Sequence, residues 1–164
     1  MSFLQSAACF FIYGFLGWLY ESIFYTVQFR KPVNTGFLKG CFCPIYGVVC
    51  VINALILGRE HKSWVIFLVS MILVSCTEYI VSAFLEAVFG KRWWDYSDWP
   101  CNINGRISLL SSVGFGILSL IQIKFIQPSL MRWITIIPDK WLYAGVMIFI
   151  VLLFMDIVYS LRKI

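Results

Sequence analysis

The chain has 164 residues, of which 61% are hydrophobic and 13% are charged, whereas soluble domains average roughly 45–50% apolar and about 25% charged residues. Its mean hydropathy is +0.87. So few charges could not cover the surface of a water-soluble globule, and this composition also excludes a disordered chain and a nucleic-acid-binding domain. We therefore predict an integral membrane protein.

Five apolar stretches approach the roughly 20 residues that a helix needs to cross the hydrocarbon core of a bilayer. They are residues 3–27, 44–58, 63–89, 107–127 and 141–161, and the fourth is expected to end near Gln127, just before Pro128. Backbone groups in lipid must bond to one another, so each stretch is predicted to be a helix. The sequence thus predicts an all-α, polytopic membrane protein with about five spans in a single domain, residues 1–164.

Basic residues near the ends of the spans predict the orientation. Eight of them fall on the loops after the first and third spans and on the tail, and five fall on the other side. This bias favours an N-terminus outside and a C-terminus in the cytoplasm. No lysine or arginine precedes Arg30, so the basic region of a cleavable signal peptide is missing and the first stretch is predicted to be a retained helix.

Three cysteines in predicted loops, Cys41, Cys43 and Cys101, are weak candidates for a metal site or a disulfide. A single Cys-x-Cys pair lacks the usual spacing of zinc ligands, and the only histidine, His61, is predicted to lie across the membrane. We therefore expect no metal and no cofactor. If the orientation were inverted, a disulfide would be the better interpretation.

Glu21 lies in the first predicted span on the same helical face as Gly14 and Gly17. Glycines on such a stripe allow another helix to approach closely, so Glu21 is predicted to point at protein rather than lipid. Charged groups at the centre of a bilayer cost about 2.5–3.5 kcal/mol on insertion scales, so they tend to face a bundle or a cavity.

The third span carries Glu78 and, nearer its predicted cytoplasmic end, Glu86. Two interpretations of Glu78 stay open: a structural anchor between helices, or a site for a substrate, an ion or a proton. Glu86 is close enough to the end of its span to reach water. Asp156, in the last span, lies close to Arg162 and is predicted to be anchored locally.

A glycine-rich connector, residues 34–47, precedes the second span, and its glycines and proline prevent a continuous helix. The span after it would cover only about 22 Å. The pattern fits either a re-entrant or broken segment, which is a recurring way to build ion and substrate sites, or an ordinary glycine-rich turn. The turn or re-entrant candidates are Gly36, Gly40, Pro44, Tyr46 and Gly47.

The second connector, residues 93–106, combines aromatic residues typical of a membrane interface with a dense polar set. Arg106, at the start of the fourth span, is expected to pair with Asp95, Glu78 or Glu86. The substrate- or ion-binding candidates in the whole chain are Glu21, Glu78, Glu86, Asp95, Asn102, Asn104 and Arg106.

Several motifs between about residue 14 and residue 116 together resemble the bacterial family of putative ABC-transporter type IV, or CmpB-like, permeases. These motifs are Gly17-Trp18 with Glu21, Gly36-Phe37-Leu38 to Gly40, Cys43-Pro44-Ile45-Tyr46-Gly47, Thr77-Glu78-Tyr79, Trp94-Asp95-Tyr96-Ser97 and Asn102-Ile103-Asn104-Gly105-Arg106-Ile107. The resemblance implies a multi-pass protein of the bacterial cytoplasmic membrane with a role in transport. The chain has no Walker-A sequence, so any ATPase would be a separate chain. Its small size suggests a homo-oligomer or a larger membrane complex.

Three functions remain in competition. The leading one is a small transporter or permease component that moves an ion or small solute through a site near the cytoplasmic half. The alternative is a non-catalytic membrane partner, sensor or assembly subunit. In that case the charged residues within the spans would hold the chain to another helix bundle. A lipid-modifying membrane enzyme is the third, but no nucleophile–base pair and no nucleotide motif supports it.

Overall fold

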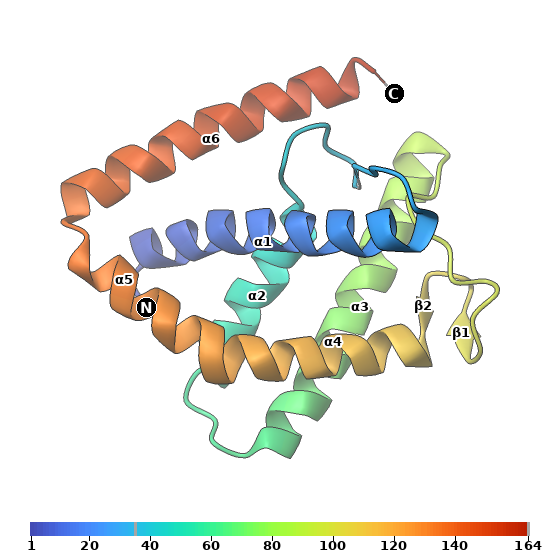
Figure 1. Ribbon diagram of the computed structural model, residues 1–164, viewed down its shortest axis with the longest axis horizontal. Coiled ribbons are helices and arrows are strands. Elements are labelled where there is room, and N and C mark those ends of the chain that lie inside the picture. Colours follow the sequence, from blue (N-terminus) through green and yellow to red (C-terminus); the bar gives the residue numbers. More distant parts are fainter. Residues whose placement is uncertain (35, 164) are drawn as a thin grey trace. The chain divides into compact units, whose positions relative to one another are not determined.

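The computed structural model describes residues 1–34 and 36–163, and in that part of the chain five helical segments and one short hairpin follow each other (Figure 1). The elements are α1 Phe3–Phe29, α2 Pro44–Leu57, α3 Ser63–Phe89, β1 Asn102–Ile103, β2 Ile107–Ser108, α4 Leu109–Ile121, the π-helical turn η1 Gln122–Ile126, α5 Gln127–Ile136 and α6 Asp139–Leu161. The predicted all-α class is confirmed.

Four helices are long and apolar enough to cross a membrane: Phe3–Val27, Ser63–Phe89, Leu109–Ile136 and Asp139–Leu161. The chain is therefore a multi-pass membrane protein. The remaining predicted span, α2, has 14 residues, which makes a helix of about 21 Å, shorter than the hydrocarbon core of about 30 Å. Its re-entrant character stays a prediction.

The fourth span does not end before Pro128. Instead α4, η1 and α5 form one helix from Leu109 to Ile136 (Figure 1). A proline inside a helix has no N–H to donate, and its ring clashes with the carbonyl four residues earlier. Here the preceding turn is widened, so that the N–H of Gln127 bonds to the carbonyl of Gln122, five residues back. This π turn accommodates Pro128 and lets the span continue.

The start of α4 is fixed by the hairpin before it. Strand β1 pairs antiparallel with β2, with Asn102 opposite Ser108 and Ile103 opposite Ile107. Ser108 then caps α4 by accepting a hydrogen bond from the N–H of Ser111, while the Ser111 hydroxyl oxygen accepts one from the N–H of Ser108. This reciprocal cap places the first turn of α4 directly under the hairpin.

The chain divides into two compact units, each described on its own: Met1–Val51 with Leu130–Ile164, and Ile52–Ser129. The second unit has a small apolar centre made of Leu57, Ile66 and Ile123. The first unit has a larger one, formed by Ala8, Cys9, Phe11, Tyr13, Ile134, Leu142 and Val146. Many other large apolar side chains on the long helices are exposed, as a lipid-facing surface requires.

Candidate transport site

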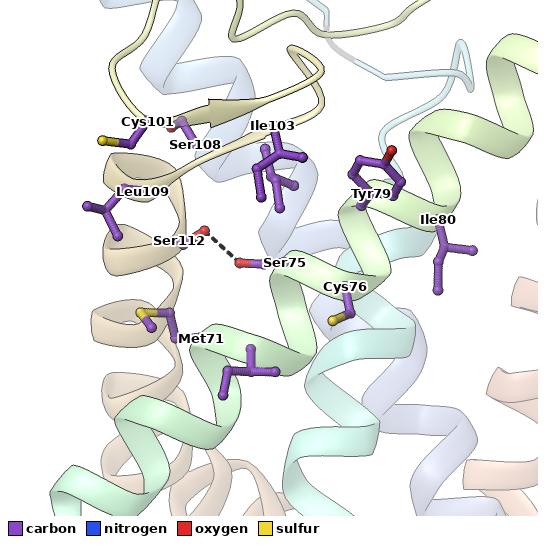
Figure 2. A pocket seen from close by; sticks show the side chains of 12 residues that line it. Met71, Ser75, Cys76, Tyr79, Ile80, Cys101, Ile103, Ser108, Leu109 and Ser112 are labelled. Carbon is purple, nitrogen blue, oxygen red and sulfur yellow. Dashed lines mark hydrogen bonds between the residues drawn. The ribbon is translucent and has the colours of Figure 1, made fainter.

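Buried polar side chains lie on α3 and on or beside α4 in the second unit, and we call this set the α3–α4 seam. On α3, Ser75, Glu78 and Ser82 recur every three or four residues and so share one face of the helix, and Ser70 lies five residues before Ser75. At the centre of the seam, the hydroxyls of Ser75 and Ser112 are hydrogen-bonded at 2.6 Å (Figure 2). The seam consists of Ser70, Ser75, Glu78 and Ser82 on α3, and of Ser108, Ser112, Ser119 and Gln122 on or beside α4.

Glu78 is the carboxylic acid of the seam and lies deep in the span. It is two residues from the midpoint of α3, Ser63–Phe89, which corresponds to about 3 Å along the helix axis. Its side chain is buried, with 7% exposed. The prediction that Glu78 lies deeper than Glu86 agrees with this position, and a carboxyl group at this depth is the least expected feature of a lipid-spanning helix.

A second polar group lies toward the other end of the seam. Asn53, in the C-terminal half of α2, donates from Nδ2 to the hydroxyl of Ser119 at 3.1 Å. Asn53 and Ser70 are both fully buried. Within the described residues, the Asn53 Oδ1 and Ser70 Oγ atoms have no hydrogen-bond partner. Neither residue is among the candidates predicted from the sequence, although the regular return of serine along the third span is a signal that could have found the seam.

A groove of about 580 Å³ lies beside the seam, between α3, α4 and the hairpin. Its lining is mostly apolar and includes Cys76 and Tyr79 of α3 together with Ile103 of the hairpin (Figure 2). The bonded hydroxyls of Ser75 and Ser112 also line this groove. The seam therefore borders open volume at the level of its central hydrogen bond.

A charged cluster closes the seam at the hairpin end. Glu86 forms ion pairs with Arg92, at 2.8 Å, and with Arg106. Of the three partners expected for Arg106, the structure selects Glu86. The hydrogen bond from Arg92 to Glu86 raises the pKa of the Arg92 guanidinium above its usual value. The Arg106 guanidinium also lies 5.4 Å from the centre of the Tyr79 ring, a cation–π contact.

The polar residues of the second connector mainly bond to one another. The backbone N–H and hydroxyl of Ser97 both donate to Asp95 Oδ1, at 2.9 and 2.5 Å, and these bonds lower the pKa of Asp95. Asn102 donates to the carbonyls of Ser97 and Trp99. Asn104 donates instead to the Tyr79 hydroxyl, at 2.8 Å. These side chains shape the loop and attach it to α3.

In the first unit, Glu21 accepts a hydrogen bond from the hydroxyl of Tyr46 at 3.1 Å. Tyr46 reaches it because Gly17 carries no side chain: a Cβ there would collide with the Tyr46 ring. Gly14 provides the same clearance for Phe42, and its carbonyl accepts the N–H of Cys43 at 3.0 Å. The close approach inferred from these glycines therefore comes from the connector and the start of α2.

The glycine-rich connector is also attached to α6. The N–H of Gly40 donates to the carboxylate of Asp156, and the N–H of Lys39 donates to the hydroxyl of Ser160 at 3.0 Å. The prediction that Asp156 is anchored locally is therefore incomplete. It does bond to Ser160 one turn away, but its long-range partner is the connector.

The candidate cysteines differ in environment. Cys43 is buried, and burial raises the pKa of its thiol, whereas Cys41 and Cys101 are exposed. Over residues 1–34 and 36–163, no three histidine, cysteine, aspartate or glutamate side chains gather closely enough to share a metal ion. Cys41 and Cys101 are therefore sterically accessible to thiol reagents, while Cys43 is shielded by its burial.

Comparison with known proteins gives one family. The profile described as putative ABC-transporter type IV matches residues 8–161. It extends beyond the motifs that suggested it and includes α6. No curated protein and no solved structure matches the chain. Because the match covers nearly the whole sequence, the chain belongs to the putative ABC-transporter type IV family.

Proposed function

We propose that the chain is a membrane-embedded transport component that moves a small cation or cationic solute, and that Glu78 is the carboxyl group that binds it. The observation that supports this most strongly is the position of Glu78: buried, close to the midpoint of a membrane-spanning helix, and on a face otherwise occupied by hydroxyls. Ionisable groups inside a membrane commonly mark ion and substrate pathways.

The surroundings of Glu78 suit a small cation. Carboxylate and hydroxyl oxygens are the donors that hard cations prefer, and Ser75 and Ser82 flank Glu78 on the same face of α3. Arg106 is held at the end of the seam by its ion pair with Glu86. In this proposal the hairpin at the end of the seam is held in position by the ion pair of Arg106 with Glu86 and by the loop residues Asp95, Asn102 and Asn104.

Glu21 is a second candidate binding group, in the other unit. Its carboxylate is already oriented by Tyr46, and the adjoining connector supplies irregular backbone, of the kind that transporters use at ion sites. Gly36, which has φ of +95°, and Gly40 let this connector follow a path that other residues would resist. Glu21 is proposed to assist transport, with a smaller effect than Glu78.

The proposed assembly rests on the family match and on the distribution of basic residues along the chain. We propose a homo-oligomer or larger complex in the bacterial cytoplasmic membrane, with a separate ATPase chain, an outer N-terminus and a cytoplasmic C-terminus. The pairing with an ATPase follows from the family name and from the missing Walker-A sequence.

The test is uptake by proteoliposomes that contain the full-length chain. A potassium diffusion potential, negative inside, drives radiolabelled sodium, rubidium or methylammonium inward, and initial rates are measured. The proposal predicts protein-dependent uptake of at least one of these probes, reduced at least tenfold by Glu78→Gln and a few-fold by Glu21→Gln.

A matched control is Glu60→Gln, which makes the same chemical change outside the spans, just before α3, where Glu60 accepts the backbone N–H groups of His61 and Lys62. It should leave uptake unchanged. Uptake that is equal in the wild-type chain, Glu78→Gln and protein-free vesicles would exclude transport by this chain. A stoichiometric partner recovered with such an inactive chain would favour the membrane-partner function instead.

A further inference from the structure

We propose that the α3–α4 seam is a proton path, along which Glu78 takes up a proton from one side of the membrane and releases it to the other. This inference rests on the proposed function and adds to it a second transported ion, the proton, and its route. It is supported by three features of the second unit: the order of the polar groups along α3, the buried oxygen atoms that lack a protein partner, and the place of the single seam carboxyl among them.

The polar groups follow each other along most of the span. From Ser70 to Glu86, α3 carries a polar group at residues 70, 75, 78, 82 and 86, so neighbouring groups are separated by roughly 4.5–7.5 Å along the axis. The whole row covers about 24 Å. Gaps of this size are within reach of a side chain together with one water molecule.

Helix α4 supplies hydroxyls at the same levels. Ile66 and Ile123 share one apolar cluster at one end, and Ser75 bonds to Ser112 nearer the middle, so α3 and α4 run antiparallel. Ser70 lies between Ile66 and Ser75 on α3, so it is expected at the level of Ser119 on α4. Ser119 accepts a hydrogen bond from Asn53. At the far end Ser108 caps α4 beside the hairpin.

Buried oxygens indicate that water enters the seam. Asn53 and Ser70 have no exposed surface, yet Asn53 Oδ1 and Ser70 Oγ find no hydrogen-bond partner in the described part of the chain. In a membrane interior such atoms are costly unless they are satisfied. Water molecules that enter the seam would satisfy these atoms, as buried waters do in polar cavities.

Glu78 is the group on this path that can hold a proton. Serine hydroxyls pass protons between neighbours, but a carboxyl group stores one: a proton from water on one side bonds to the carboxylate, and the same O–H bond later breaks toward the other side. Within the second unit, the charged or titratable groups around α3 include Glu86, Tyr79 and Cys76 of α3 itself, Arg92 of the loop after it, Arg106 beside the hairpin, and Lys124 of η1 at the opposite end.

The experiment uses full-length protein in vesicles loaded with a pH-sensitive dye. A potassium diffusion potential, negative inside, is imposed without added sodium or amine, and the rate of lumenal acidification is recorded. The wild-type chain should acidify the lumen at least tenfold faster than Glu78→Gln. Ser75→Val, which removes the central hydroxyl, should slow it several-fold, and Glu60→Gln should match wild type.

A second measurement guards against a variant that only misfolds. Glu78→Asp keeps a carboxyl group and should retain part of the acidification, unlike Glu78→Gln. In infrared spectra, the carboxyl band assigned to Glu78 by its loss in Glu78→Gln should shift in D₂O, and this exchange should be several-fold slower in Ser70→Ala and Ser75→Val.

The outcomes separate the two proposals. Cation uptake that depends on Glu78, with acidification equal to that of protein-free vesicles, would overturn the proton path and leave the proposed function intact. Acidification that depends on Glu78 without uptake of any labelled cation would support the path and make the proton the transported ion. A Glu78 carboxyl whose proton does not exchange in D₂O would also overturn the path.

Discussion

The backbone N–H of Gly40 lies 3.0 and 3.1 Å from the two carboxylate oxygens of Asp156, 116 residues further along the chain. A side chain at position 40 would displace this contact, because a Cβ there would be 2.6 Å from the carboxylate. Ser160 adds a second bond by accepting the N–H of Lys39. Gly40 of the connector and Asp156 of the membrane-spanning helix α6 thus join these two segments. Neither residue type alone would predict this contact.

Asp156→Ala is predicted to detach the connector from α6. Hydrogen bonds to a charged group contribute about 1.5–3 kcal/mol each, so we expect a loss of roughly that size in the free energy of unfolding. Hydrogen–deuterium exchange of residues 39–42 should become faster. Asp139→Ala, which removes an exposed acid at the start of α6, should leave exchange in the connector unchanged, and equal exchange in both variants would contradict this role for Asp156.

Gly17→Ala is predicted to push Tyr46 away from Glu21. The added methyl group would collide with the Tyr46 ring, and overpacking of this kind costs typically about 1–3 kcal/mol. Thermal unfolding in detergent should show the loss. Gly145→Ala in α6 is the matched control, because a Cβ there meets nothing within 4 Å and alanine favours a helix by up to about 1 kcal/mol. Equal stability of the two variants would exclude the close contact.

Asp95 is predicted to hold its loop in shape except in strong acid. Its pKa lies below the usual 3.8, chiefly because the Ser97 hydroxyl and N–H donate to it, with a smaller contribution from the charge of Arg92. A carboxyl whose folded pKa is lowered adds stability above its unfolded pKa, and this stability is lost as pH falls through the folded pKa. The Ser97 amide resonance should therefore titrate with a midpoint below 3.8. A midpoint at or above that value would contradict the hydrogen bonds seen here.

The helices can be predicted well from the sequence, because hydrophobic length alone determines where a span lies. The sequence predicts the third span at residues 63–89, and α3 is Ser63–Phe89. The continuation of the fourth span past Pro128 cannot be predicted in the same way. It depends on one widened turn at Gln122–Ile126, and the hydropathy of the sequence does not predict such a turn.

The site is less predictable, because pairing between distant residues has no local signal. Arg106 has three carboxylates within reach on sequence grounds, and only the three-dimensional position of the hairpin selects Glu86. The spacing of charges along the sequence predicts contacts of Asp156 with nearby residues only. It gives no information on Gly40 in the connector, 116 residues away. The depth of Glu78, by contrast, follows from its place in the span, and its surroundings of serine are visible as a periodic pattern.

The orientation predicted from basic residues can be tested with the two exposed loop cysteines, Cys41 and Cys101. Each is retained alone in a chain whose other cysteines are replaced. A membrane-impermeant maleimide should label both in inside-out vesicles and neither in right-side-out vesicles. Labelling of both from the outside would reverse the predicted topology, and labelling from opposite sides would contradict the five-span arrangement.

The central claim is that the α3–α4 seam admits water and ions as far as Glu78, and reactivity of introduced cysteines measures this most directly. Ser75→Cys and Glu78→Cys are made in a cysteine-free chain, with Ile66→Cys, in the dry centre of the same unit, as the control. A small charged thiol reagent should modify positions 75 and 78 at least tenfold faster than position 66. Reaction at 75 and 78 as slow as at 66 would mean a dry, structural seam and would contradict the claim.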